Sequence, residues 1–246
     1  MNGEMHILVA DLALACVNKT CRMILVPRWG GIEIGATLSD DDRIMWERIE
    51  PTGPKKQLVH RCYIDSEDPK DHGCVTRALS HAEGSLGFVE LYLRGELGDA
   101  YPTEEAFLEN LGLFLGIASH HIADLCTPVH VGHRINYKAL GYKSYARFHQ
   151  KVERDLGRAA HSATITLHRP QLVDITAEYF WGIAQDAYER HFSRLADLYE
   201  RRDTQAIERM TDAVLGTAMR HTADVWFTVL KSSGMTDRRW TQAPLV

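Results

Sequence analysis

The sequence predicts an all-α protein, a single-domain multi-helix bundle that covers residues 1–246. Apolar residues recur at the spacing of amphipathic helices through most of the chain. No segment of any length alternates polar and apolar residues as a half-buried strand does. Hydrophobic residues make up 45% of the 246 residues, which is enough to build one sizeable core.

The N-terminal part of the chain is predicted to hold two helices separated by a long irregular region. An apolar helix covers residues 5–18, and helical character resumes over residues 74–97. Residues 19–73 contain the stretches WGG, SDDD, EPTGPKK and EDPKDHG. Because these residue types favour turns and loops, we expect this region to be largely irregular.

Two N-caps mark the helices in the middle of the chain. Thr103 is followed by two glutamates, which favour the positive end of a helix, and this helix is expected to run to about Leu125. Pro128 ends it, because proline cannot continue a helix. Ser144 is expected to cap a further helix that runs to about Gly157.

Two long amphipathic helices are predicted in the C-terminal part. The first covers Pro170–Asp203 and the second covers Thr204–Lys231. Each carries an apolar stripe at helical spacing, so both are expected to pack on the core with one face.

Composition narrows the possible functions. The net charge of −5 argues against a general electrostatic grip on nucleic acid, which leaves nucleic acid possible only as a substrate. No apolar run approaches the ~20 residues of a transmembrane segment, and the N-terminal stretch lacks the basic region of a signal peptide. The five cysteines have no metal-ligand spacing such as CxxC and fit reduced thiols. We therefore expect a cytoplasmic protein.

Histidines and carboxylates interrupt an otherwise apolar helix in the stretch HHIADLCTPVH, residues 120–130. His120 and Asp124 are four residues apart and share a helix face, and His130 follows. His149 and Glu153 repeat this spacing on the next predicted helix. Two helices that each present a histidine and a carboxylate can build an internal metal site. These ligand types suit zinc or another divalent transition ion.

A surface ion pair is the alternative explanation of a His/Asp pair at this spacing. The predicted helix is apolar around its whole circumference, however, and a buried aspartate without compensation is costly. A metal ion would compensate Asp124, which favours the ligand interpretation. His121 points about 100° away from His120 and is expected to be structural or, alternatively, to support a ligand.

The residues His120, Asp124, Pro128 and His130 form a His-x3-Asp-x5-His motif with a proline two residues before the last histidine. In this motif the sequence resembles the superfamily of zinc-dependent phospholipases C and zinc-dependent single-strand nucleases. The resemblance implies an all-helical fold of the zinc-dependent phospholipase C type, with a metal cluster in a cleft.

Other parts of the chain extend the resemblance. His149 and Glu153 match the His-x3-Glu pair that follows in the superfamily. GATLSDDD and HRCYIDSEDP resemble two upstream motifs and point to Asp40 and His60. His6, in MHILVADLALA, is similar to a histidine that opens the first helix.

The resemblance implies two or three zinc ions, each with its own ligands. One ion would be held by Asp40, His60, His120 and Asp124, a second by His130, His149 and Glu153, and a third by His6, Asp124 and the α-amine of Met1. Met1 stands where the superfamily has a tryptophan.

The implied activity is that of a zinc-dependent phosphodiesterase, a hydrolase resembling phospholipase C. A metal-bound hydroxide would attack a small phosphate ester or a phospholipid headgroup, and Asp40 would orient it or accept its proton. Arg43 matches by spacing a phosphate-binding arginine of the nuclease branch, whereas Glu153 is typical of the phospholipase branch. A single-strand nuclease or nucleotidase therefore remains an alternative. An intracellular member redeployed for Lewis-acid chemistry on a small metabolite is another.

Overall fold

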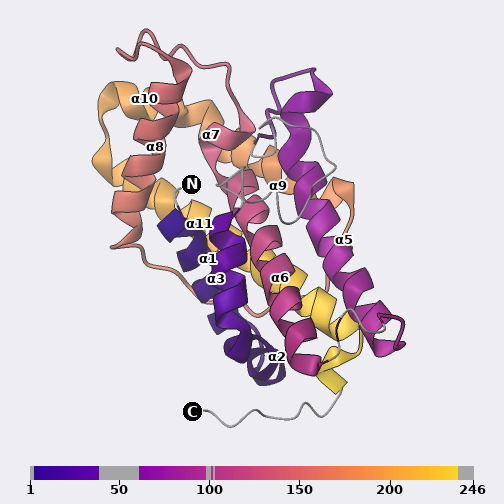
Figure 1. The fold of residues 1–246 in the computed structure, drawn as a ribbon. Helices are drawn as coiled ribbons and strands as arrows, with labels where there is room; N and C mark the ends of the chain where they lie inside the picture. The colour runs from indigo at the N-terminus through magenta and orange to yellow at the C-terminus, as the bar shows by residue number, and fades with distance from the viewer. Residues whose placement is uncertain (1–2, 39–60, 98–100, 102, 238–246) are drawn as a thin grey trace.

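The computed structural model describes residues 3–38, 61–97, 101 and 103–237, which form an all-α structure without strands in these ranges (Figure 1). The predicted fold class is therefore confirmed. Among the described helices, none combines the length and the apolar character that crossing a membrane requires.

The helices follow one another with short connections and several short turns of 3₁₀ or π helix. The α-helices are α1 (Gly3–Cys16), α2 (Lys19–Leu25), α3 (Trp29–Leu38), α5 (Gly73–Leu93), α6 (Glu104–Cys126), α7 (Pro128–Val131), α8 (Tyr145–Ala160), α9 (Ala177–Ala187), α10 (Ser193–Arg201) and α11 (Thr204–Ser232). The short turns are η1 (Val26–Arg28), η2 (Pro69–His72), the π-helical η4 (Tyr188–Phe192) and η5 (Met235–Asp237).

Helix α6 is the centre of the bundle. It packs against α1, α3, α5, α9 and α11 (Figure 1), and every residue from 115 to 132 is buried. The indole Nε1 of Trp226 on α11 donates a hydrogen bond to the Leu115 carbonyl at 3.1 Å. Any polar side chain in the second half of α6 is thus held away from bulk water.

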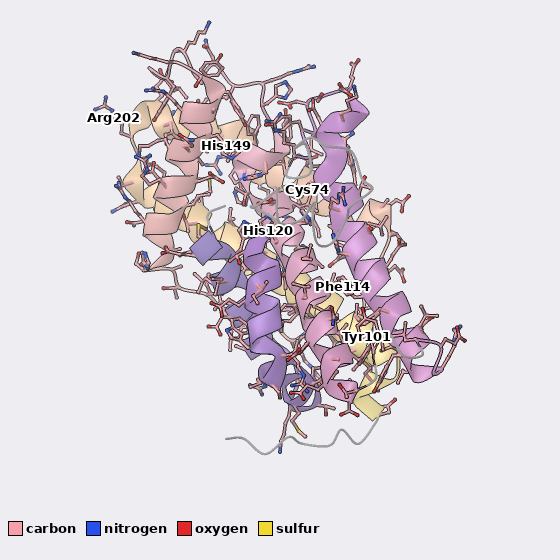
Figure 2. The ribbon with its side chains drawn as sticks, in the orientation of Figure 1. Cys74, Tyr101, Phe114, His120, His149 and Arg202 are labelled. Atoms are coloured by element: carbon pink, nitrogen blue, oxygen red, sulfur yellow. The ribbon has the colours of Figure 1, made fainter. Side chains whose placement is uncertain are left out.

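The two ends of α6 differ in chemistry. Near its N-terminal end, Phe107 stacks on Tyr92 of α5 with ring centroids 3.7 Å apart, and Phe88 lies 4.9 Å from both Phe107 and Tyr101. Near its C-terminal end lie the histidines and the aspartate of the sequence motif (Figure 2, which labels His120). The aromatic end anchors the helix pair, and the polar end carries the candidate site.

Helices α3 and α6 cross at backbone contact. A Cβ atom on Gly35 would lie 2.2 Å from the Leu113 carbonyl oxygen, and one on Gly116 would lie 2.2 Å from the Ile32 carbonyl oxygen. Only glycine fits at these two positions, because atoms cannot approach so closely. The crossing brings the backbone of α3 next to His120, one turn beyond Gly116.

The prediction that residues 19–73 are largely irregular was wrong for residues 19–38. Asn18 caps α2 by accepting a hydrogen bond from the Cys21 amide, and α3 follows after η1. Gly30 and Gly31, in the stretch WGG, favoured a turn in the sequence, but they lie within α3. Gly31, like Gly35 in the next turn of α3, permits the close contact with α6.

The predicted helix over Pro170–Asp203 was also wrong at its start. Helix α9 begins at Ala177, with the Thr176 side chain as N-cap. The preceding segment runs along α11, where the Gln171 amide donates to Asp224 Oδ1 at 2.7 Å. Asp224 thus satisfies the Gln171 amide in this extended segment.

The remaining helix predictions agree with the structure. Thr103 and Ser144 cap α6 and α8 through hydrogen bonds from the amides of Ala106 and Arg147. Pro128 does not only end α6. It also occupies the first turn of α7, where its missing N–H costs nothing.

Candidate metal centre

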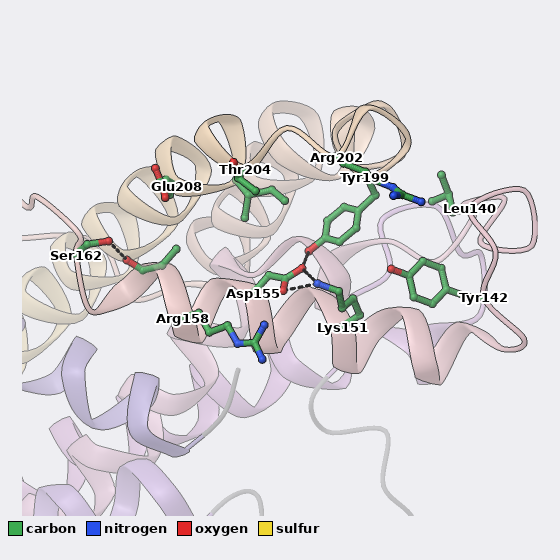
Figure 3. A pocket seen from close by; sticks show the side chains of 12 residues that line it. Leu140, Tyr142, Lys151, Asp155, Arg158, Ser162, Tyr199, Arg202, Thr204 and Glu208 are labelled. Atoms are coloured by element: carbon green, nitrogen blue, oxygen red, sulfur yellow. Dashed lines mark hydrogen bonds and ion pairs between the residues drawn. The ribbon is translucent and has the colours of Figure 1, made fainter.

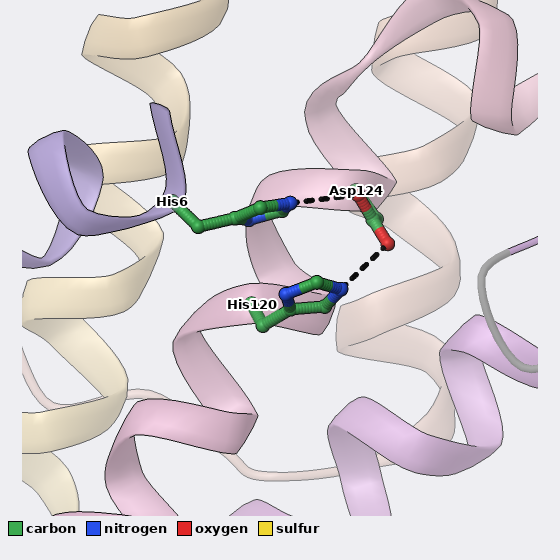
Figure 4. Close-up of side chains that lie close together, drawn as sticks. All are labelled: His6, His120 and Asp124. Carbon is green, nitrogen blue, oxygen red and sulfur yellow. Dashed lines mark ion pairs between the residues drawn. The ribbon is translucent and has the colours of Figure 1, made fainter. Parts of the chain in front are cut away.

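Three predicted ligands meet between α1 and α6 and are called here the buried group: His6, His120 and Asp124 (Figure 4). Their side chains are at most 1% exposed. His6 Nε2 lies 3.5 Å from Asp124 Oδ1, and His120 Nε2 lies 3.3 Å from Asp124 Oδ2. Both imidazoles therefore point at one carboxylate.

A carbonyl of α3 fixes the orientation of His120. Its Nδ1 lies 2.8 Å from the Ala36 carbonyl oxygen, and since a carbonyl only accepts, Nδ1 carries the proton. In the neutral ring the lone pair then sits on Nε2, which faces Asp124. Two electron-rich atoms facing each other need a cation or a second proton between them, and a metal ion meets that need.

His6 has the properties of a neutral ligand. Neither of its ring nitrogens makes a hydrogen bond within the described part of the chain. Its ring stacks on that of His120 with centroids 3.8 Å apart. Burial, followed by the charge of His120, lowers the pKa of His6 well below its usual value. One of its two nitrogens is thus available as a lone-pair donor at neutral pH.

Three further predicted ligands, called the outer group, meet at α7 and α8: His130, His149 and Glu153. Oε1 of Glu153 lies 3.2 Å from His130 Nε2 and 3.4 Å from His149 Nε2. The side chains of His149 and Glu153 are 20% and 21% exposed. The outer group is thus the part of the centre that a dissolved molecule can reach.

His130 connects the two groups. Its Nδ1 lies 3.8 Å from Asp124 Oδ1, while its Nε2 faces Glu153. Burial lowers the pKa of His130 to about 4, against the opposing charge of Asp124. For Glu153, burial acts to raise the pKa, but the hydrogen bonds with His130 and His149 outweigh it and the pKa falls well below its usual value. Neutral imidazole and ionised carboxylate are the protonation states that bind metal.

The donor separations fit zinc. With zinc–nitrogen and zinc–oxygen distances of about 2.0–2.2 Å, two ligands of a tetrahedral ion lie about 3.4 Å apart. The four closest pairs in the buried and outer groups are 3.2–3.5 Å apart, longer than most hydrogen bonds between such atoms. The residues present therefore fit the metal that the resemblance implies.

Two residues near Asp124 were not singled out from the sequence as candidate metal donors. Cys74 on α5 and His121 on α6 form, with Asp124, a third set of donor atoms that lie within 4.8 Å of one another. Neither has a spacing that signals a metal site, since the packing of α5 on α6 brings them together. A buried histidine beside the motif was the only signal.

The other predicted site residues lie outside the described residues. These are Met1, Asp40, Arg43 and His60. Their roles as ligand, catalytic residue or phosphate contact remain predictions.

Hydrogen bonds around α7 hold the segment that carries His130. The Tyr145 hydroxyl lies 2.9 Å from the Val129 carbonyl and 2.6 Å from the Gly132 carbonyl. Asp65 accepts from the amides of His133 and Arg134 and lies 2.8 Å from His133 Nδ1. These contacts fix His130 relative to α8.

A cavity of about 530 Å³ lies beside α8, and none of its lining residues is a predicted metal ligand (Figure 3). Lys151 and Tyr199 both bond to the carboxylate of Asp155 there. Among the described residues that line this cavity, no set of metal donors like those around Asp124 occurs.

Sequence comparisons identify no relative, since no family model and no curated protein matches the chain. In fold, the chain is similar to the alpha-toxin of Clostridium perfringens isolated from avian strain SWCP, with a TM-score of 0.57 and 13% sequence identity. The match covers 93% of this chain and 64% of the toxin chain. The present chain thus spans less than two thirds of that structure, and the likeness at this identity concerns the fold.

Proposed function

We propose that this chain is a metal-dependent phosphoric-ester hydrolase that uses zinc and resembles phospholipase C. The observation that carries the proposal is the convergence of the buried and outer groups, at tetrahedral donor spacing, through Asp124 and His130. The resemblance of the motif residues to the zinc-dependent phospholipase C and nuclease superfamily supports the reaction class. The all-α fold similarity agrees with it.

The buried group and the outer group would have different roles because they differ in exposure to solvent. The buried group would supply His120 and Asp124 to one ion and His6 and Asp124 to another, both away from solvent, with His120 fixed by the Ala36 carbonyl. The outer group would hold an ion beside solvent, where His149 and Glu153 are partly exposed. A phosphate ester would therefore bind on the outer side. Bound divalent ions at such a centre activate water at neutral pH and stabilise negative charge on phosphate oxygens.

The substrate class follows from what the centre offers. A set of cations recognises the phosphate group itself, so we propose a small phosphate ester or a phospholipid headgroup as substrate. In the same proposal Asp40 orients or deprotonates the attacking water, and Arg43 contacts the phosphate.

The test measures metal content and hydrolysis together. Zinc-loaded protein is assayed on bis(p-nitrophenyl) phosphate, a phosphocholine ester and single-stranded DNA, with His120→Ala and Glu153→Gln as site variants. We expect turnover of at least one substrate by the unaltered chain. Each site variant should lose at least about 100-fold in rate and also bind less zinc, because ligand loss should cost at least as much as loss of a supporting residue.

His161→Ala is the matched control, because His161 is an exposed histidine at the end of α8. Its rate and zinc content should equal those of the unaltered chain. Hydrolysis of the DNA alone would move the proposal to the nuclease branch. Full zinc occupancy without turnover of any of the three substrates would refute the hydrolase proposal.

A further inference from the structure

Cys74 and His121 face each other between α5 and α6. Both are fully buried. The sulfur Sγ of Cys74 lies 3.8 Å from His121 Nδ1 and 3.3 Å from the His121 carbonyl oxygen. Together with Asp124 they offer one thiol sulfur, one imidazole nitrogen and one carboxylate oxygen within 4.8 Å of one another. We call this set the sulfur group.

The spacing of the sulfur group fits a thiolate-bound ion. With a zinc–sulfur distance of about 2.3 Å and a zinc–nitrogen distance of about 2.0–2.1 Å, the two donors lie about 3.5 Å apart at the tetrahedral angle, and about 3.8 Å apart when the angle opens to about 120°. The observed separation of 3.8 Å between the Cys74 sulfur and His121 Nδ1 is thus one that a single ion can bridge.

We infer that Cys74, His121 and Asp124 form a further metal position, for a thiophilic divalent ion such as zinc, beside the buried group. The two groups have only Asp124 in common. A carboxylate can bridge two ions, and bridged ions in two-metal sites lie about 3.5–4 Å apart. The inference rests on the proposed function in needing a chain that binds metal, but it does not need phosphate-ester hydrolysis.

Ion binding changes the state of the thiol. Without an ion the sulfur of Cys74 keeps its proton, and its S–H donates to the His121 carbonyl. When the ion binds, the S–H bond breaks, the sulfur–metal bond forms and the proton leaves to solvent. The positive charge of the ion replaces the proton as the partner of the sulfur.

The sulfur group suits a structural metal ion rather than a catalytic one. Its three donors are at most 1% exposed, so a dissolved substrate does not reach them. The ion would link α5 to α6 at the level of Asp124, and would thereby fix the carboxylate that His6 and His120 also face.

The test is zinc-edge X-ray absorption of the zinc-loaded chain, with metal content measured on the same sample. We expect one sulfur neighbour at about 2.3 Å from zinc. Cys74→Ala should remove the sulfur neighbour and lower the zinc content by one ion per chain. Cys126→Ala is the matched control, because Cys126 is an equally buried cysteine of α6 outside the donor sets, and it should change neither measurement.

The outcomes separate this inference from the proposed function. A zinc-loaded chain whose spectrum shows only nitrogen and oxygen neighbours overturns the sulfur group and leaves the buried and outer groups standing. A sulfur neighbour that survives Cys74→Ala also overturns it. A chain that binds no zinc overturns both proposals. The first outcome requires only the unaltered chain, so the inference stays testable if Cys74→Ala does not fold.

Discussion

Asp124 is the residue on which the donor sets converge. Its Oδ1 faces His6 and, at 3.8 Å, His130, while its Oδ2 faces His120. Burial acts to raise the pKa of Asp124, but its interactions with His130 and His120 outweigh it, so the pKa lies well below its usual value. A carboxylate that stays ionised at 1% exposure needs nearby positive charge, and a metal supplies it without protonating the histidines.

His221, which lies outside the candidate centre, should make the stability of the folded chain depend on pH. Its Nδ1 lies 2.8 Å from the Tyr179 hydroxyl. Burial, followed by the charge of Arg220, lowers the pKa of His221 to about 4 against the opposing charges of Asp224 and Asp186. In the unfolded chain this pKa is near 6.5.

The direction in which stability changes with pH follows from the number of protons that the folded and unfolded chains bind. Between pH 6.5 and pH 4 the unfolded chain binds a proton at His221 that the folded chain does not, so stability is full above pH 6.5 and falls as the pH is lowered. The loss at this residue is on the order of 2 kcal/mol after allowance for its partial exposure. His221→Gln should make urea-unfolding free energy fall less steeply over this range. Parallel curves for the two proteins would contradict the prediction.

Helices α3 and α6 show, at the scale of elements, how packing positions the centre. Because Gly35 and Gly116 allow backbone contact, the Ala36 carbonyl reaches His120 Nδ1 at 2.8 Å. The orientation of one ligand therefore depends on two glycines that do not touch any donor atom.

Gly116→Ala should separate the two helices. The added methyl group would lie 2.2 Å from the Ile32 carbonyl and 3.0 Å from the Ala36 amide nitrogen, and backbone cannot move aside as a side chain can. We expect a loss of about 3 kcal/mol in unfolding free energy, with weaker zinc binding because His120 loses its fixed orientation.

Gly216→Ala is the matched control for this prediction. Gly216 lies inside α11, and a Cβ there would meet nothing within 4 Å. This variant should be about 0.5–1 kcal/mol more stable than the unaltered chain, since alanine loses less entropy on folding. Equal unfolding midpoints in urea for the two variants would show that the helix contact is not close.

The same elements show what sequence could and could not predict. Thr103 and Ser144 mark helix starts because capping is a local property of the chain. Pattern also predicted that His120 and Asp124 share a helix face. Gly31 was misread as a turn residue because the helix that it contacts, α6, lies far away in the chain, and Cys74 was missed because its neighbours are 47 and 50 residues away along the chain. Such contacts between distant residues leave no spacing signal.

At the scale of the whole molecule, the candidate centre joins elements that are far apart in the chain. It takes His6 from α1, His120 and Asp124 from α6, His130 from α7, and His149 and Glu153 from α8. The aromatic contacts of Phe88 and Tyr92 with Phe107 lie at the other end of α6. Metal binding should therefore stabilise one end of the bundle more than the other.

We expect chelation of the metal to destabilise the helices that supply ligands more than the rest of the chain. An ion that binds only the folded chain contributes about 4 kcal/mol at a free concentration 1,000 times its dissociation constant. Its removal should raise amide hydrogen exchange in α1 and α8, which supply ligands, and leave the paired ends of α5 and α6 around Tyr92 and Phe107 unchanged. Asp124→Asn should show the same raised hydrogen exchange in α1 and α8 even with zinc present, because the amide keeps the shape of the side chain and removes its charge. The measurement is hydrogen exchange by mass spectrometry on both proteins, with and without zinc. A uniform change along the chain would mean that the centre does not tie α1 and α8 to α6.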